Sequence, residues 1–179
     1  MRIVSGSHKG KRLIAPKKLP VRPTTDMAKE GLFNILNNRY DIDELKVLDL
    51  FSGTGNISFE FASRGSNSIV AVDSYAGCVQ FISKTTKELN FPIRTVKSDV
   101  FKFLEKTRDK VDIVFADPPY NLHLEQFEKI VLLVFRNELL LEDGILVLEH
   151  SDQTDLSQLD YFSDSRKYGG SIFSFFQKD

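Results

Sequence analysis

Apolar positions recur along the chain in short runs that are separated by turns and by segments with helical spacing. Continuous apolar runs of five or six residues are typical of strands that are buried on both faces of a parallel sheet. Such runs occupy residues 47–51, 69–73, 93–97, 111–116 and 145–149. Helices are predicted between them at residues 57–64, at 74–89 with Ser74 as the cap, around 101–104 and around 127–134. Alternating strands and helices indicate a doubly wound α/β domain of Rossmann-like type with a mostly parallel sheet.

The two ends of the chain depart from this alternation. Residues 1–24 predict a small N-terminal β-hairpin, because two β-like runs flank a loop with Gly6 and Gly10. A helix is expected from Thr25 or Asp26 to about Asn38, so residues 25–179 would form the main domain. Residues 159–167 and 171–177 predict two further strands, which we expect to be antiparallel.

Length and composition favour one domain with a substantial core. The chain has 179 residues, of which 41% are hydrophobic and 27% are charged. One cysteine and three scattered histidines make an internal disulfide or a metal site unexpected. Neither the features of a signal peptide nor an apolar segment long enough to span a bilayer is visible in the sequence. We therefore expect a monomeric cytoplasmic protein without a metal.

Charge is unevenly distributed along the chain. The net charge is −1, yet residues 1–22 carry +7 without a single acid, so the remainder carries −8. A basic segment on an acidic body is typical of proteins that grip a nucleic acid, although a solvated tail without a partner has the same pattern. The candidate RNA-binding residues are Arg2, Lys9, Lys11, Arg12 and Arg22.

Candidate ligand-binding residues follow the first three predicted strands. The turn Asp49-Leu50-Phe51-Ser52-Gly53-Thr54-Gly55 contains two glycines, which allow close approach of the backbone to a ligand. A dinucleotide fingerprint requires a third glycine where Ser58 stands, which argues against a nicotinamide dehydrogenase. Asp73 is suited to accept hydrogen bonds from ribose hydroxyls, and Asp99 from an adenine amino group. Adenosine with a short zwitterionic tail, as in S-adenosylmethionine, fits this pattern, although a lone Asp is more often a helix cap.

The fourth predicted strand ends in Asp117-Pro118-Pro119-Tyr120. Proline cannot donate to a sheet ladder, so the strand must stop there and present a carboxylate, carbonyls and an aromatic ring at its carboxyl end. Ligands bind at that edge in open α/β sheets. Asp117 and the Pro118 carbonyl could accept the hydrogens of a planar amine, Pro119 would shape the turn, and Tyr120 could stack on a base.

These motifs, in this order, resemble the class I S-adenosylmethionine-dependent methyltransferases that modify exocyclic amino nitrogens. More specifically, the chain is similar to the RsmD family, whose members methylate N2 of one guanine in bacterial 16S ribosomal RNA. The additional matching stretches are Met1-Arg2-Ile3-Val4-Ser5-Gly6, Arg22-Pro23-Thr24-Thr25-Asp26, Glu30-Gly31-Leu32-Phe33-Asn34, Glu149-His150-Ser151 and Arg166-Lys167-Tyr168-Gly169. The chain departs from the family pattern at Met27, where Arg is common, and at Asp73, where Glu is frequent.

The resemblance implies a set of site residues and a partner, the 16S rRNA of the small ribosomal subunit. Residues 117–120 would be catalytic. The residues expected to bind S-adenosylmethionine are Asp49, Phe51, Ser52, Gly53, Thr54, Gly55, Asp73, Ser74, Asp99 and Val100. Two alternatives stay open from the residues alone: an adenine-N6 or cytosine-N4 methyltransferase acting on DNA or RNA, and a noncatalytic ribosome-assembly factor.

Overall fold

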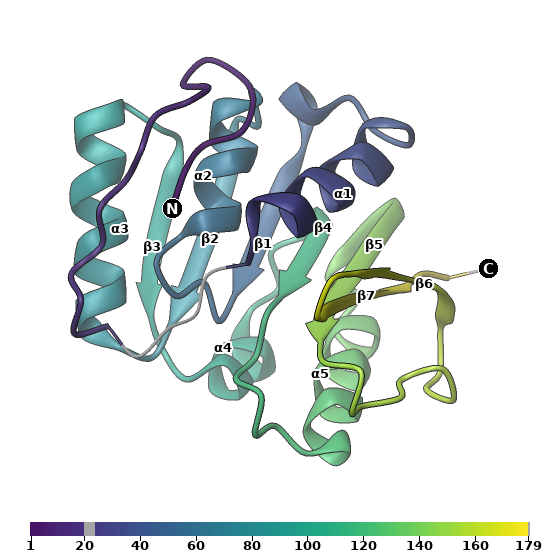
Figure 1. Ribbon diagram of the computed structural model, residues 1–179. Helices are drawn as coiled ribbons and strands as arrows, with labels where there is room; N and C mark the ends of the chain where they lie inside the picture. Colours follow the sequence, from purple (N-terminus) through teal and green to yellow (C-terminus); the bar gives the residue numbers. More distant parts are fainter. Residues whose placement is uncertain (20–23, 179) are drawn as a thin grey trace.

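A seven-stranded sheet lies between two layers of helices in the computed structural model of the protein, which describes residues 1–19 and 24–178 (Figure 1). The strands are β1 (Lys46–Leu50), β2 (Ser68–Asp73), β3 (Ile93–Lys97), β4 (Val111–Ala116), β5 (Leu140–His150), β6 (Phe162–Tyr168) and β7 (Ser171–Phe176). The helices are α1 (Asp26–Asn37), the short 3-10 helix η1 (Ile42–Glu44), α2 (Asn56–Ser63), α3 (Ala76–Leu89), α4 (Val100–Lys106) and α5 (Leu124–Arg136). The predicted doubly wound α/β fold is confirmed.

The order of strands in the sheet is β3-β2-β1-β4-β5-β7-β6. Strands β1 to β5 pair in parallel, whereas β7 runs antiparallel to both β5 and β6, as expected for the C-terminal pair. From β1 the chain proceeds to β2 and β3 on one side and returns through β4 and β5 on the other. This reversal of strand order opens a crevice at the carboxyl ends of β1 and β4, where α/β sheets bind ligands.

Each face of the sheet packs on its own hydrophobic core. Helices α1, α2 and α3 cover one face, with Leu32, Phe59 and Ile82 among the buried residues. Helices α4 and α5 cover the other face, where Leu104 and Ile130 are fully buried. Because residues on a strand alternate between the two faces, Asp49 in β1, Asp73 at the end of β2 and Asp117 after β4 share the face of α1 to α3.

The N-terminal segment, residues 1–19, runs along α2 and α3 (Figure 1). The predicted hairpin is reduced to one β-bridge between Arg2 and Arg12, flanked by backbone hydrogen bonds. Ile3 and Leu13 are buried in the same core as α1 and α2. At Gly6 (φ +82°), a Cβ would lie 1.8 Å from the carbonyl oxygen of Ser63, so only glycine fits this contact. The segment is therefore anchored to the main domain over most of its length.

Most element ends agree with the sequence pattern, with two informative differences. Thr25 caps α1, and its side chain accepts a hydrogen bond from the Ala28 N–H. The expectation that Ser74 caps the third helix is wrong, because the N-cap is Tyr75 and the helix begins at Ala76. Strand β5 begins at Leu140, five residues before the apolar run, because Leu140 pairs with Val111 of β4 before a register shift, after which pairing resumes at Ile145. In the part of the chain that the structure describes, no helix is long and apolar enough to cross a membrane.

Candidate active site

The loop after β1 contains three residues with positive φ, namely Phe51, Gly53 and Gly55. Phe51 adopts φ +54° despite its bulky side chain, a strained conformation of the kind that concentrates at functional sites. Gly53 also has positive φ, and both residues line a cavity. Gly55 has positive φ as well (+78°), but it packs against the core, since a Cβ there would lie 2.9 Å from the Ile82 side chain. The two glycines of the turn therefore have different roles, and only Gly53 faces the cavity.

Asp73, at the end of β2, fixes the shape of this loop. Its Oδ2 accepts a hydrogen bond from the Gly53 N–H, and its Oδ1 accepts one from the Tyr75 N–H, both at 2.8 Å. Each carboxylate oxygen has a second lone pair, which a ligand hydroxyl can still use. The short aspartate thus binds the glycine loop directly while remaining in the cavity wall beside Ser74.

Asp49 lies at the base of the cavity and is only 1% exposed. Its Oδ2 accepts hydrogen bonds from the N–H and the hydroxyl of Ser58. Burial raises the pKa of Asp49 to about 7, against the stabilising effect of these hydrogen bonds on the charged form. Ser58 occupies the position where a dinucleotide site would need glycine, and here its side chain holds a carboxylate.

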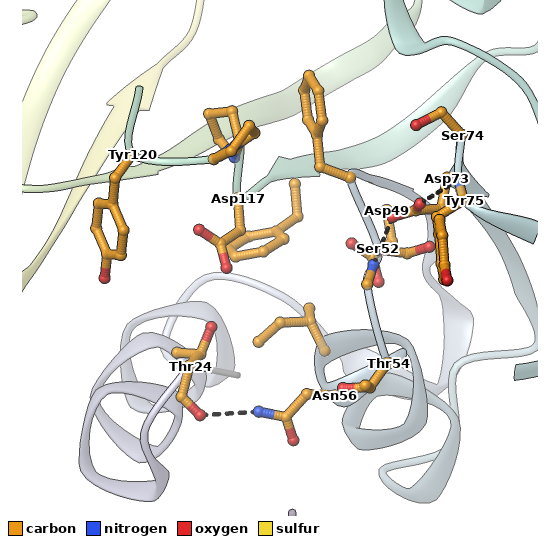
Figure 2. Close-up of a pocket in the computed structure, with 16 residues that line it drawn as sticks. Thr24, Asp49, Ser52, Thr54, Asn56, Asp73, Ser74, Tyr75, Asp117 and Tyr120 are labelled. Atoms are coloured by element: carbon orange, nitrogen blue, oxygen red, sulfur yellow. Dashed lines mark hydrogen bonds between the residues drawn. The ribbon is translucent and has the colours of Figure 1, made fainter. Parts of the chain in front are cut away.

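A cavity of about 500 Å³ opens at the carboxyl ends of β1, β2 and β4. Figure 2 shows Asp73 and Tyr75 toward one end of it, Asp117 and Tyr120 toward the other, and Thr24 and Asn56 across from Asp117. The predicted site residues that line it are Asp49, Phe51, Ser52, Gly53, Thr54, Asp73, Ser74, Asp117, Pro118, Pro119 and Tyr120. The hydroxyl of Ser52 is buried in this lining and has no hydrogen-bond partner among the described residues, so it is available to a ligand.

Three predicted cofactor residues lie outside this cavity lining. Gly55 packs on Ile82, as described above. Asp99 is the N-cap of α4, where its Oδ1 accepts a hydrogen bond from the Lys102 N–H. Val100 is buried in the core beneath α4 and α5. Asp99 therefore has the capping role that is common for an aspartate at a helix start.

Asp117 presents its carboxylate to the other end of the cavity. No described residue donates a hydrogen bond to this carboxylate or to the Pro118 carbonyl, whereas the Pro119 carbonyl accepts one from the Leu122 N–H within the turn. Burial, followed by the nearby carboxylates of Glu149 and Asp49, raises the pKa of Asp117 well above its usual range. Tyr120 is 60% exposed at the rim. This end of the cavity thus offers hydrogen-bond acceptors beside an accessible aromatic ring.

Sequence reasoning missed the polar residues that close the cavity opposite Asp117. Thr24 lines the cavity, donates through its hydroxyl to Glu149 and accepts through its carbonyl from the Asn56 amide. The Oδ1 of Asn56 accepts a hydrogen bond from the ammonium group of Lys29, which is fully buried. Thr24 and Glu149 stand in stretches that carry the family resemblance, and this was the available signal. Their contact, between residues 125 positions apart, could not be read from the sequence.

Met27 and Arg22 are two further positions that the sequence singles out. Met27, where the family commonly has Arg, is 57% exposed on the first turn of α1 and lies near Gly169 outside the cavity lining. Arg22 lies outside the described residues, so its predicted RNA contact stays a prediction. Among the described residues, no group of three or more His, Cys, Asp or Glu side chains is arranged to hold a metal ion.

The fold is the Rossmann-like fold of the class I methyltransferases. A solved structure from Escherichia coli, provisionally named as the methyltransferase yhhF, covers 100% of this chain and 98% of its own with a TM-score of 0.87 at 24% identity. A Thermus thermophilus structure described as the 16S rRNA N2 G1207 methyltransferase RsmC, in complex with AdoMet and guanosine, has a TM-score of 0.70. It is 20% identical and covers 90% of this chain and 45% of its own. At these identities the structures show the shared fold.

Sequence comparison identifies the family. The model of the family described as "Conserved hypothetical protein 95" matches residues 1–177, so the chain belongs to this family, and its resemblance to the RsmD family is confirmed. A Bacillus subtilis relative, provisionally named as the rRNA methyltransferase YlbH, is 32% identical over 163 residues, 88% of this chain and 86% of the relative. The Escherichia coli protein named "Ribosomal RNA small subunit methyltransferase D" is 29% identical over 157 residues, 87% of this chain and 77% of the relative.

Proposed function

We propose that this protein transfers a methyl group from S-adenosylmethionine to the exocyclic N2 of a guanine in the 16S rRNA of the small ribosomal subunit. The observation that carries this proposal is the acceptor end of the cavity, where the Asp117 carboxylate and the Pro118 carbonyl have no hydrogen-bond donor among the described residues. An exocyclic amine brings two hydrogens that need such acceptors. The names of the relatives support small-subunit rRNA as the substrate. The RsmC structure, which shares the fold and is described in complex with guanosine, supports guanine as the base.

The residues at the opposite end suit the methyl donor. Asp73 keeps lone pairs for ribose hydroxyls, and the unpaired hydroxyl of Ser52 offers a hydrogen bond to the amino-acid part. Phe51, Ile57 and Phe115 supply apolar walls, and a cavity of about 500 Å³ is within the range of small-molecule sites. Bound S-adenosylmethionine would supply an activated methyl group on a sulfonium centre. We therefore assign cofactor binding to this end and the base to the end of Asp117 and Tyr120.

The chemical task of the protein is mainly alignment. The guanine amine is a weak nucleophile because its lone pair is delocalised into the ring, so it must be held at attack distance in one orientation. Hydrogen bonds to Asp117 and to the Pro118 carbonyl fix the amine and stabilise the positive charge that develops on nitrogen. Tyr120, exposed at the rim, is placed to stack on a base that is turned out of the RNA.

The basic N-terminal segment supplies a surface for the RNA backbone. Arg2, Lys9, Lys11 and Arg12 are exposed, and the segment that carries them is fixed to α2 by the buried carboxylate of Glu60. Arg2 is partly engaged, since its Nε lies 3.0 Å from Asp26 Oδ2. Contacts from these side chains to phosphates would position the RNA without reading its sequence.

The chemical part of this proposal is tested by Asp117→Ala. This variant should bind S-adenosylmethionine in calorimetry with an affinity close to wild type, because Asp117 lies at the end of the cavity assigned to the guanine. It should lose methyl transfer to small subunits, measured with a labelled methyl donor. Turnover near that of wild type would refute the role of Asp117. Loss of cofactor binding together with turnover would show that the two ends of the cavity are assigned wrongly.

A further inference from the structure

A row of four acids crosses the sheet on the face covered by α1, α2 and α3. Asp49 pairs in register with Ala71, two residues before Asp73, and with Phe115, two residues before Asp117. Ala116 and Leu148 are also partners in register, and Asp117 and Glu149 are the residues that directly follow them in the chain. The Cα atoms of Asp117 and Glu149 are therefore neighbours, and the two side chains share this face. Glu149 is the member of this row to which neither the sequence nor the comparisons give a role.

Glu149 is held firmly from two directions. Its Oε2 accepts a hydrogen bond from the Thr24 hydroxyl and its Oε1 one from the Ser171 hydroxyl, both at 2.7 Å. The residue is 4% exposed and does not line the cavity, so it does not reach the reacting atoms. Burial raises the pKa of Glu149, and the hydrogen bonds from Ser171 and Thr24 oppose that increase by favouring the charged form.

Asp117 has the opposite environment. Its carboxylate faces the cavity without a donor from the described residues, and the titratable groups that face it are Glu149 from β5 and Asp49 from β1. From α1, the buried cation Lys29 is already engaged by Glu60 and Asn56. Of the neighbouring pair, Glu149 therefore has the better support for a negative charge.

We propose that Glu149 is a positioning residue for methyl transfer, whose carboxylate, fixed by Thr24 and Ser171, faces Asp117 and makes it a stronger base. This inference rests on the proposed function, in which Asp117 accepts the amine hydrogens. As the bond from N2 to the methyl carbon forms and the bond from that carbon to sulfur breaks, the amino group must release one proton. A carboxylate beside a second, fixed negative charge accepts that proton more readily than an isolated one.

The substitution Glu149→Gln tests this role because it removes the charge and keeps a side chain that can still bond to both hydroxyls. The acid limb of the pH–rate profile of methyl transfer should move to lower pH by about one unit, since a fixed like charge raises a neighbouring pKa. The plateau at high pH should fall severalfold because Asp117 becomes a weaker base. The two profiles should therefore differ in shape, whereas a purely structural defect would scale the whole profile by one factor.

Ser171→Ala is the matched control. It removes one of the two hydrogen bonds to Glu149 but keeps its carboxylate, so any loss of packing at this place is shared, while the acid limb should move less than in Glu149→Gln because the Thr24 hydroxyl still favours the charged form. An acid limb that stays in place in Glu149→Gln, or that moves equally in both variants, would overturn the proposal.

A second readout does not depend on activity. The carboxyl carbon of Asp117, labelled with ¹³C and identified by its absence in Asp117→Asn, can be titrated by NMR in the protein without RNA. Its midpoint should lie at lower pH in Glu149→Gln than in wild type, and identical midpoints would refute the inference. If wild type transfers no methyl group to rRNA while the midpoints differ, the proposed function fails and the interaction between Glu149 and Asp117 stands.

Discussion

Glu60 on α2 holds the N-terminal segment to the main domain through a fully buried carboxylate. Its two oxygens accept hydrogen bonds from the N–H groups of Val4 and Ser5, at 2.9 and 3.0 Å, and lie 3.2 Å from the ammonium of Lys29 and 2.9 Å from Nε of Arg64. Glu60→Ala would leave the buried Lys29 without its ion-pair partner and two backbone donors unsatisfied. Breaking a buried pair on one side costs about 3–5 kcal/mol, a large share of the roughly 5–15 kcal/mol that stabilises a typical domain.

Urea unfolding followed by circular dichroism measures this cost directly. Glu88→Ala is the matched control, because Glu88 pairs with Lys84 on the surface of α3 and a surface pair is worth at most about 1 kcal/mol. Amide exchange at Val4 and Ser5 should become faster in Glu60→Ala at all urea concentrations that keep the domain folded. A loss of stability no larger than that of Glu88→Ala would refute the view that this network anchors the segment.

Three further predictions concern the site and the RNA surface. Tyr120→Ala should reduce kcat/KM for methyl transfer by about tenfold or more, because stacking on one base is worth about 1–3 kcal/mol. Tyr120→Phe keeps the ring and should stay close to wild type. Equal activity of all three proteins would exclude stacking. Replacing Lys9, Lys11 and Arg12 by Gln should make RNA binding less dependent on salt in filter-binding titrations. The slope of log affinity against log salt concentration should fall by up to about 0.9 for each phosphate that the variant no longer neutralises. The same change at Lys84, Lys110 and Lys129 should leave the slope unchanged. Asp49, with its pKa raised to about 7, binds a proton in the folded protein that the unfolded chain has lost, so the stability from this proton disappears as pH rises through about 7. Asp49→Asn should therefore lose less stability than wild type between about pH 5 and about pH 8 in urea unfolding. Parallel pH dependence of the two proteins would contradict the raised pKa of Asp49.

The order of strands and helices could be predicted because apolar runs and helical spacing are local properties of the sequence. The same holds for Asp73, which ends β2, and for Asp117, which follows β4, so both lie at the carboxyl edge of the sheet. Asp99 follows a strand in the same way, yet it caps α4 and stays outside the cavity lining. Position at a strand end is thus necessary for the site but does not decide between binding a ligand and capping a helix.

What the sequence could not predict depends on contacts between distant segments. Thr24 meets Glu149 across the cavity wall, and Glu60 meets Val4 and Ser5 from the other end of the domain. The seven basic residues near the N-terminus suggested an RNA-binding hairpin separate from the main domain, because charge dominates that part of the sequence. Two apolar residues in it, Ile3 and Leu13, are nonetheless buried in the main core. Such docking requires the shape of the receiving surface, which only the folded structure supplies.

The central claim is that the amine held beside Asp117 is N2 of a guanine in 16S rRNA. Labelled S-adenosylmethionine should be offered with small ribosomal subunits that lack the modification and with naked 16S RNA, followed by nucleoside analysis and mapping of the labelled position. The account predicts label in N2-methylguanosine at a single nucleotide, and no label with Asp117→Ala. Label in N6-methyladenosine or N4-methylcytosine, or no transfer to either RNA substrate by the wild-type protein, would contradict it.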